Sequence, residues 1–207
     1  MKTFKILTLL ALVVVVSAFA ANAVVKNVRN GYSIGDDAAD FYLRNVDNKM
    51  VSLKDYDNAQ GFIVVFTCNT CPFSVANEDR IIALDKKYKT LGYPVIAINP
   101  NNPQIKPGDS FKAMQQRAQD KGFTFPYLLD DGQEVYPKYG ATKTPHVYII
   151  KKESDRNTIK YIGAIDNNTR NEAAVTERYV EDAVDALLAG KNVQVTETKA
   201  IGCSIKS

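Results

Sequence analysis

The sequence is poor in the residues that build structural metal sites and disulfide frameworks. Its 207 residues include only three cysteines and one histidine. A structural zinc site takes four ligands, so all four of these residues would have to serve, and the composition argues against such a site. A chain of this length can bury a full core without cysteine staples, so three cysteines indicate chemistry more than a disulfide framework.

The sequence also lacks a marked excess of charge of either sign. It has 26 basic and 23 acidic side chains, and the basic residues are scattered among the acidic ones. This pattern gives no electrostatic reason to expect nucleic acid or an anionic membrane surface as a partner. The sequence contains no internal repeat and no linker long enough to divide it, which predicts one domain over residues 33–190 and a tail over residues 191–207.

The first 23 residues have the pattern of an export signal. Lys2 and Lys5 precede an apolar run over residues 6–16, and small residues suited to cleavage follow at positions 18–23. The alternative is an uncleaved membrane anchor, but the apolar run is shorter than the roughly 20 residues of a spanning helix. The sequence therefore predicts a cleaved signal peptide over residues 1–23 and a periplasmic or secreted protein that is not held at the membrane.

Hydrophobic patterns predict an alternation of strands and helices. The expected elements, in order, are a hairpin over 41–53, a buried strand over 62–66, a helix ending at Gly92, a buried strand over 94–98, a loop over 99–108, helices over 111–121 and 135–139, a second hairpin over 146–163, and a long helix over 172–189. The two buried strands are joined through a helix, so they should be parallel. This order predicts an α/β fold.

The most informative motif is the Cys-Asn-Thr-Cys-Pro stretch at residues 68–72. It follows the buried strand directly and precedes a helix, so the cysteines are expected at a helix N-terminus. Backbone N–H groups and the positive end of the helix dipole stabilise a thiolate there. On this pattern Cys68 is predicted to be the exposed nucleophile and Cys71 the resolving cysteine, one turn into the helix.

Further stretches match motifs of a known family. They are Gly35-Asp36-Asp37-Ala38-Ala39-Asp40-Phe41, similar to an opening G-x-x-A-P-D-F with Ala39 in place of proline; Thr144-Pro145, just ahead of a strand; and Ile201-Gly202-Cys203-Ser204-Ile205-Lys206, similar to the G-C-S-I-K end of one peroxiredoxin-like subgroup. With the cysteine pair, they resemble the thioredoxin-fold redoxin group, which holds the AhpC/TSA peroxiredoxins and the TlpA-like exported oxidoreductases.

This resemblance implies a thioredoxin-like fold, with a central mixed sheet flanked by helices and an N-terminal β-hairpin extension. It also implies a cis peptide bond between Thr144 and Pro145, with the Thr144 backbone facing the sulfurs and binding the substrate chain as an added strand. The expected activity is thiol–disulfide exchange without a cofactor. The expected partners are protein or small-molecule thiols and disulfides, and an electron donor that the sequence does not identify.

Two other functions compete with this prediction. A thiol peroxidase of this group would carry P-x-x-x-T-x-x-C, but Val65 stands three residues before Cys68, and Cys68 stands three before Cys71. A cation beside the sulfur could come from Arg80 or Arg117, although arginines paired with carboxylates are the simpler expectation.

The second competitor is a copper chaperone that binds the metal through Cys68, Cys71 and His146, although such chaperones usually space their cysteines by three residues. A lone histidine beside a strand is more often an ordinary packed residue. Cys203 is open to two interpretations. It is either a third redox cysteine, bonding to an active-site sulfur or to another chain, or a tail cysteine without a catalytic role.

Overall fold

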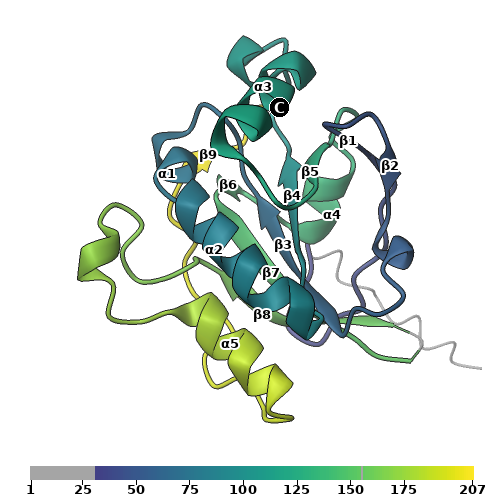
Figure 1. The fold of residues 1–207 in the computed structure, drawn as a ribbon, viewed down its shortest axis with the longest axis vertical. Coiled ribbons are helices and arrows are strands. Elements are labelled where there is room, and N and C mark those ends of the chain that lie inside the picture. The colour runs from purple at the N-terminus through teal and green to yellow at the C-terminus, as the bar shows by residue number, and fades with distance from the viewer. Residues whose placement is uncertain (1–30, 155) are drawn as a thin grey trace, which may run out of the picture.

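The computed structural model describes residues 31–154 and 156–207, so the predicted export signal over residues 1–23 lies outside the described residues. Within them, seven strands form a mixed sheet in the order β2-β1-β5-β4-β3-β7-β8, and β6 and β9 form a separate two-stranded sheet (Figure 1). This arrangement confirms the predicted α/β class. In the part of the chain that was searched, no helix is long and apolar enough to cross a membrane.

The described elements have the following bounds. The strands are β1 (Leu43–Asn45), β2 (Met50–Val51), β3 (Gly61–Phe66), β4 (Val95–Asn99), β5 (Tyr127–Leu129), β6 (Lys143–Thr144), β7 (His146–Lys152), β8 (Asn157–Gly163) and β9 (Cys203–Ser204). The α-helices are α1 (Pro72–Val75), α2 (Glu78–Tyr88), α3 (Phe111–Lys121), α4 (Val135–Tyr139) and α5 (Tyr179–Leu188). The 3-10 helices are η1 (Leu53–Asp55), η2 (Lys89–Leu91), η3 (Pro107–Asp109) and η4 (Glu172–Ala174).

Strand β3 lies inside the sheet and leads directly into the cysteine motif. It pairs in parallel with β4 on one side and antiparallel with β7 on the other. All six of its residues are buried, as its continuous apolar sequence predicts for a sheet covered on both faces. The parallel pairing of β3 and β4 confirms the prediction made from the helix between them.

Two apolar cores lie on the two faces of the sheet. On one face, Ile63 and Val65 of β3 pack with residues of α2, α3 and α5. On the other face, Phe62, Val64 and Phe66 pack with residues of α4 and of the segment before β1. Successive residues of a strand point to opposite faces, so one apolar strand supplies both cores. This packing fixes the position of the carboxyl end of β3.

The two predicted hairpins are present, and the first is continuous with the sheet. β1 pairs with β2 across a short polar turn and also with β5, so this hairpin extends the sheet at one edge. β7 and β8 form the second hairpin. The helices predicted over 111–121 and 135–139 match α3 and α4. Strand β5 was not predicted, because three buried residues are too short a run to show a period.

The prediction of one helix over residues 172–189 is wrong at its start. Residues 172–174 form the 3-10 helix η4, capped by Asn171, and α5 begins only at Tyr179. Side-chain contacts hold the intervening chain in a loop: Asn167 binds the backbone N–H groups of Thr176 and Glu177. These contacts satisfy backbone groups outside a helix, so the helical pattern is overridden there.

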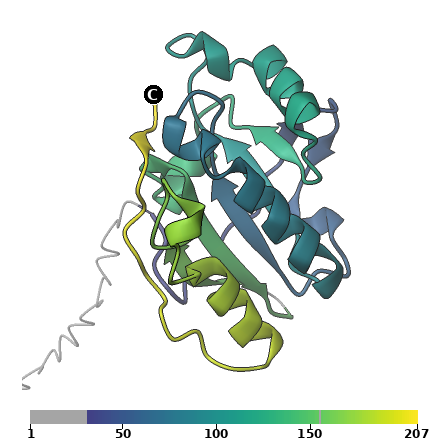
Figure 2. The same cartoon turned by 60° about the vertical axis from the view of Figure 1, so that its left-hand side comes forward.

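Residues 191–207, predicted as a tail, fold back onto the domain. The tail passes along β8, where Ile162 exchanges backbone hydrogen bonds with Thr196 and Thr198, and it then forms β9 beside β6. Figure 2 shows this segment in yellow, running along the outside of the molecule towards the chain end. The tail therefore brings Cys203 back to the region around β6, far from α5.

Candidate active site

The structure brings all three cysteines of the chain together. Cys68 lies two residues after β3, and Cys71 is the residue that precedes α1. Cys203 comes from β9 in the tail, and its Sγ lies 2.7 Å from Sγ of Cys71. The Cys203 backbone N–H also points to Sγ of Cys71, at 3.4 Å. Cys71 hydrogen-bonds with Cys68 as well, so it is the central sulfur of the group.

The Thr144–Pro145 segment lies against two of the sulfurs. Its peptide bond is cis, as the resemblance predicted. Oγ1 of Thr144 lies 3.3 Å from Sγ of Cys68, and the Thr144 carbonyl oxygen lies 3.0 Å from Sγ of Cys71, which donates to it as a thiol. The backbone of Thr144 pairs with Cys203, so its strand edge is occupied by the tail.

The dipeptide between Cys68 and Cys71 is held by a buried carboxylate, Asp109. One carboxylate oxygen accepts hydrogen bonds from the backbone N–H groups of Asn69, at 2.8 Å, and Thr70, at 3.2 Å. The other accepts from the Thr70 hydroxyl and from the Asn101 amide, both at 2.8 Å. Asp109 is fully buried at the end of η3. The loop predicted over 99–108 therefore leads to a residue that fixes the motif.

The prediction that Cys68 is the exposed sulfur is wrong in this structure. Cys68 is 3% exposed and Cys71 2%, whereas Cys203 is only partly buried. Cys68 is enclosed because Thr144 lies against its sulfur and the Asp109 loop holds the residue that follows it. The most accessible sulfur of the group is thus the one contributed by the tail.

The pKa values of the two motif cysteines move in opposite directions. The hydrogen bond from the Cys68 thiol to Cys71 raises the pKa of Cys68, and burial and the nearby charge of Asp109 raise it further. The same bond lowers the pKa of Cys71 to about 4, assisted by bonds from the Cys203 thiol and from the backbone N–H groups of Ser74 and Cys203. The pair titrates as a unit, and its first negative charge resides on Cys71.

His146 lies in β7 beside the site but faces another environment. Its Nδ1 accepts a hydrogen bond from the Thr142 backbone N–H at 3.4 Å, and its ring centroid is 4.9 Å from that of Tyr148. Burial lowers its pKa to about 4, which keeps the ring neutral. Within residues 31–154 and 156–207, no group of three or more His, Cys, Asp or Glu side chains is arranged to hold a metal ion. The copper ligand set is therefore not assembled in the described structure.

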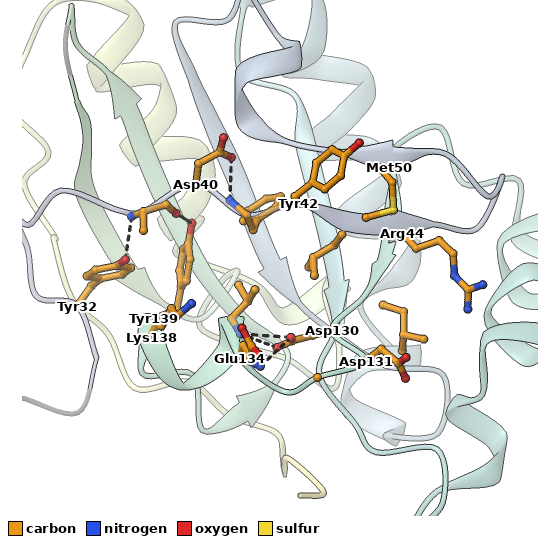
Figure 3. Close-up of a pocket in the computed structure, with 16 residues that line it drawn as sticks. Tyr32, Asp40, Tyr42, Arg44, Met50, Asp130, Asp131, Glu134, Lys138 and Tyr139 are labelled. Carbon is orange, nitrogen blue, oxygen red and sulfur yellow. Dashed lines mark hydrogen bonds between the residues drawn. The ribbon is translucent and has the colours of Figure 1, made fainter.

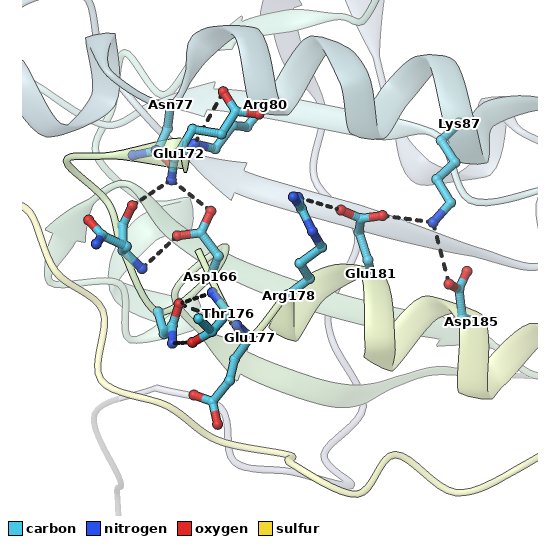
Figure 4. Close-up of polar contacts among 12 residues, drawn as sticks. Asn77, Arg80, Lys87, Asp166, Glu172, Thr176, Glu177, Arg178, Glu181 and Asp185 are labelled. Atoms are coloured by element: carbon cyan, nitrogen blue, oxygen red, sulfur yellow. Dashed lines mark hydrogen bonds and ion pairs between the residues drawn. The ribbon is translucent and has the colours of Figure 1, made fainter. Parts of the chain in front are cut away.

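The two arginines considered as active-site cations are engaged elsewhere. The Arg80 guanidinium binds Asp166 at 2.7 Å and the Asn168 carbonyl oxygen at 2.9 Å (Figure 4). The Arg117 guanidinium forms two hydrogen bonds to the Glu78 carboxylate, at 2.7 and 2.6 Å. Pairing with carboxylates is thus confirmed for both. Arg80, however, is buried with its partner, and its ion pair holds the loop before α5 to α2.

A cavity of about 550 Å³ opens between the β1–β2 edge of the sheet and α4, and no cysteine lines it. Figure 3 shows Tyr42, Arg44 and Met50 on its β1–β2 side and Glu134, Lys138 and Tyr139 on its α4 side. The Asp130 carboxylate at its floor accepts backbone hydrogen bonds from residues 134–136 at the start of α4. That aspartate is therefore accounted for as a helix-start acceptor.

Sequence reasoning missed Asp109 and the Thr144 hydroxyl as parts of the site. A loop aspartate resembles many others in sequence, and only the fold places it over residues 69 and 70. The one available signal was the length of the Pro- and Asn-rich loop, since long ordered loops in a compact domain are often functional. The Thr144 hydroxyl was not predicted, because the family resemblance implies a role only for the backbone of this residue.

The fold and the site together define a thioredoxin-fold protein of the redoxin group. The AhpC/TSA family model matches residues 34–162, and the chain belongs to this family. The crystal structure of an uncharacterized conserved protein from Geobacillus kaustophilus is 35% identical in sequence, covers 86% of this chain and 94% of its own, and has a TM-score of 0.79. A putative thiol:disulfide interchange protein DsbE from Chlorobium tepidum, 21% identical, covers 76% of this chain and 99% of its own with a TM-score of 0.57.

A curated relative carries a functional name. The thiol-disulfide oxidoreductase ResA of Halalkalibacterium halodurans is 24% identical over 121 residues. The match takes in 58% of this chain and 64% of the relative, so the chain spans less than two thirds of that protein's length.

Proposed function

We propose that the protein is a thiol–disulfide oxidoreductase in which Cys68 and Cys71 cycle between dithiol and disulfide. The observation that carries the proposal is that both sulfurs lie against Thr144, at 3.3 and 3.0 Å, next to Pro145. An extended peptide that displaced the tail from the Thr144 edge and bound there in its place would bring its disulfide to the two sulfurs. The family and the name of the ResA relative support the same activity.

The hydrogen bond between the two cysteines supplies the first proton transfer. The pair shares one proton, and in its stable form the charge resides on Cys71. The form that attacks is the minor one, in which this proton has moved from Cys68 to Cys71 and the charge resides on Cys68 as a thiolate. That thiolate attacks one sulfur of the substrate disulfide. The substrate S–S bond breaks, the first substrate thiolate leaves with the bonding electron pair and takes up a proton, and a mixed disulfide on Cys68 remains.

Cys71 then resolves the mixed disulfide. It loses its proton again, attacks Sγ of Cys68, and releases the second substrate sulfur as a thiol. The substrate has gained two electrons and two protons, and the enzyme holds a Cys68–Cys71 disulfide. An external dithiol must reduce that bond before the next turnover, and the reverse sequence oxidises a dithiol substrate. No cofactor enters these steps.

The proposal includes a location outside the cytoplasm. It rests on the signal-like pattern of residues 1–23, in which Lys2 and Lys5 precede an apolar run. In an oxidising compartment the pair needs an electron supply to work as a reductant, and otherwise it works as an oxidant. Fractionation of cells that express the full chain, with N-terminal sequencing of the product, tests this part. A product that retains residue 1 in the cytoplasmic fraction would contradict it.

Reduction of insulin or glutathione disulfide by the wild type and by single cysteine variants tests the activity. We expect Cys68→Ser to be inactive and Cys71→Ser to accumulate mixed disulfides, because it can attack but cannot resolve. Activity that survives in Cys68→Ser would refute the assignment of the nucleophile. A wild type that reduces neither substrate and oxidises no dithiol would refute the proposed function.

Two further measurements on the same variants test the competing functions. Dithiothreitol-coupled peroxide consumption separates a peroxidase, which we do not favour because Arg80 and Arg117 are engaged by carboxylates. Metal analysis after expression with copper tests the chaperone. Stoichiometric copper that is lost in His146→Ala would overturn a purely redox function.

A further inference from the structure

The tail is fixed at the site by contacts on both sides of Cys203. Beyond it, the Lys206 backbone donates to the Asn101 side chain at 2.9 Å and accepts from the Asn102 N–H at 2.8 Å and the Gln133 amide at 2.9 Å. Before it, the tail is bonded to Ile162 of β8. The hydrogen bonds of Lys206 and of Ile162 therefore help to hold Cys203 in place, in addition to the two-residue strand β9.

Gly202 shows how closely the tail follows the Thr144–Pro145 segment. A Cβ atom at this position would overlap the carbonyl group of Thr144, so only glycine allows the approach. The next residue, Cys203, pairs with Thr144 in antiparallel register. The tail therefore occupies the strand edge on which the proposed function places an extended substrate. A cysteine in this strand stands where a substrate cysteine would stand.

The sulfur of Cys203 is the partner that Cys71 already contacts. The two Sγ atoms are 2.7 Å apart, and Cys71 also hydrogen-bonds to Cys68. A thiolate that attacks a disulfide must reach one of its sulfurs. Cys71 contacts both Cys68 and Cys203. Its sulfur can therefore be attacked by Cys203 when it is bonded to Cys68, and by Cys68 when it is bonded to Cys203.

We propose that Cys203 is a third catalytic cysteine, which replaces Cys68 as the disulfide partner of Cys71. The proposal rests on the proposed function, which supplies the Cys68–Cys71 disulfide. The Cys203 thiolate attacks Sγ of Cys71, a Cys71–Cys203 bond forms, and the Cys68–Cys71 bond breaks. The electron pair goes to Cys68, which takes up the proton that Cys203 lost. No electrons are gained or lost overall, and an external dithiol later reduces the tail disulfide.

The electrostatics of the group favour this exchange after the active-site pair has been oxidised. In the reduced protein, burial and the hydrogen bond to and charge of Cys71 raise the pKa of Cys203 to about 11. Once Cys71 is part of a disulfide, its negative charge is gone and only burial still opposes ionisation of Cys203. The tail thiol therefore becomes more nucleophilic when there is a disulfide for it to attack.

The exchange has two consequences for the site. It restores the Cys68 thiol while the oxidising equivalent moves to Cys203, the most accessible sulfur of the group. It also ties the tail covalently over Thr144, so the tail can no longer leave that strand edge to admit a substrate chain until the external dithiol has acted. The Cys71–Cys203 form is thus the one presented to the electron donor, and the donor meets it at the tail.

Disulfide mapping of Cys68→Ser tests the proposal without relying on turnover. The variant is treated with diamide, which oxidises neighbouring thiols without being one of the assayed substrates, then digested under acidic conditions and analysed by mass spectrometry. We expect one intramolecular bond between Cys71 and Cys203, which closes a 132-residue separation and increases mobility on a non-reducing gel. A variant that keeps two free thiols, or carries only diamide adducts, would overturn the proposal. Wild-type protein should yield both the Cys68–Cys71 and the Cys71–Cys203 peptides.

Two matched variants test whether the position of the tail thiol, and not its mere presence, determines the disulfide. The double variant Cys203→Ser/Ser204→Cys moves the tail thiol by one residue, to the exposed side of β9 where Lys143 contacts Ser204. Gly202→Ala keeps all three thiols but forces the tail away from Thr144. With Cys68→Ser as background, both should form little Cys71 disulfide to the tail. Equal yields in all backgrounds would show random pairing of thiols and would overturn the proposal.

Turnover provides an independent readout. We expect Cys203→Ser to reduce disulfide substrates with a dithiol donor about tenfold more slowly than wild type, because the donor must then reach the buried Cys68–Cys71 bond. Unchanged turnover would overturn the role of Cys203 while leaving the proposed function intact. If the wild type does not turn over but Cys68→Ser still forms the Cys71–Cys203 bond, the proposed function fails and the exchange geometry stands.

Discussion

The protein has one polar cluster at the start of α1 and another on α2, and the two differ in how their charges are arranged. In the Arg80 cluster, the guanidinium forms an ion pair with Asp166 and a hydrogen bond to the Asn168 carbonyl oxygen, so each charged group has a fixed partner. The sulfur cluster of Cys68, Cys71 and Cys203 brings together three chemically equal groups around one negative charge. Figure 4 shows the first cluster joining α2 to the loop before α5.

The comparison indicates that burial supports the stability of the fold in the Arg80 cluster and chemical reactivity in the sulfur cluster. A buried ion pair is most stable with both partners in place. Removing one partner leaves the other as an uncompensated buried charge, which destabilises the fold. Sulfurs that share a proton can also share a bond, because each is both a possible nucleophile and a possible leaving group. The comparison predicts that mutations in the first cluster change folding and that mutations in the second change chemistry.

The largest expected effect is the loss of activity in Cys71→Ser. Disulfide reduction should fall at least about 1,000-fold, because the resolving step has no nucleophile. The free energy of unfolding of the reduced protein at pH 5 should change much less, because most of the stabilisation from the lowered pKa of Cys71 is already lost at this pH and serine is close to cysteine in size. Coupled insulin reduction and urea denaturation measure the two quantities. A large loss of stability at pH 5 would break the comparison.

Next in size is Arg80→Ala, which should destabilise the protein by about 3–5 kcal/mol because it leaves the buried Asp166 without its cation. Activity per folded molecule should be retained, since Arg80 contacts no sulfur among its described contacts. Urea denaturation and activity at low temperature check the two parts. Arg80→Lys, which keeps the charge, should lose less stability. A fully stable Arg80→Ala without activity would reverse the roles of the clusters.

The pH dependence of stability should identify Cys71 as the charged sulfur. Its folded pKa of about 4 lies below the ordinary value of 9.0, so the stabilisation is present above that value and is lost as pH falls towards about 4. His146, whose pKa burial lowers from 6.5 to about 4, adds a loss of the same sign. Reduced wild type should therefore be more stable at pH 8 than at pH 5.

Cys71→Ser is the control for this dependence. It should show a smaller difference between pH 8 and pH 5, which reflects His146. Thiolate absorbance near 240 nm at pH 7 should be present in reduced wild type and absent in the variant. Absorbance that persists in Cys71→Ser and disappears in Cys68→Ser would assign the charge to the other sulfur.

Asp109→Asn should have a smaller effect, and a mixed one. The carboxylate accepts two hydrogen bonds on each oxygen, and asparagine replaces one of these oxygens with a donor. Loss of two of the four bonds should cost about 1–3 kcal/mol of stability, and loss of the negative charge should lower the pKa of Cys68. Alkylation of Cys68 at pH 8 should become faster. Thr70→Val removes one of the bonds but keeps the charge, so its alkylation rate should stay near that of wild type. Equal acceleration in both variants would show that loop opening is the cause.

The smallest effect belongs to Lys87→Ala, two turns after Arg80 on α2. Lys87 binds Glu181 at 2.7 Å and Asp185 at 3.4 Å, but it is largely exposed to solvent. An ion pair of this kind contributes about 0–1 kcal/mol. Urea denaturation should therefore barely distinguish this variant from wild type, and salt should remove what difference there is. A loss as large as that of Arg80→Ala would show that burial is not what separates the two ion pairs.

The parts of the fold and site that follow from local sequence could be predicted. The apolar run of β3 and the cysteine motif after it are contiguous, so their relation to α1 follows from sequence alone. The cis bond before Pro145 followed from the family resemblance. The exposure of Cys68 was predicted wrongly, because its cover comes from Thr144 and the Asp109 loop, which lie far away in the sequence.

The position of Cys203 also depends on contacts with residues that are distant in the sequence, so it could not be predicted. Its sequence neighbourhood favours neither a redox role nor a passive tail, since a two-residue strand carries no periodic signal. Only the backbone pairing with Thr144 places its sulfur next to Cys71. The start of α5 was missed for a related reason: side chains such as Asn167 bind the backbone and hold a loop where the pattern is helical.

The separation of Cys71 and Cys203 also orders the events of synthesis. The two residues stand 132 positions apart, so a ribosome that has just made Cys71 works for roughly ten seconds more before it reaches Cys203. During that time Cys68 and Cys71 have no third sulfur beside them and can be oxidised only as a pair. A newborn chain therefore begins as a two-thiol protein and becomes a three-thiol one when its last few residues emerge and pair with β6.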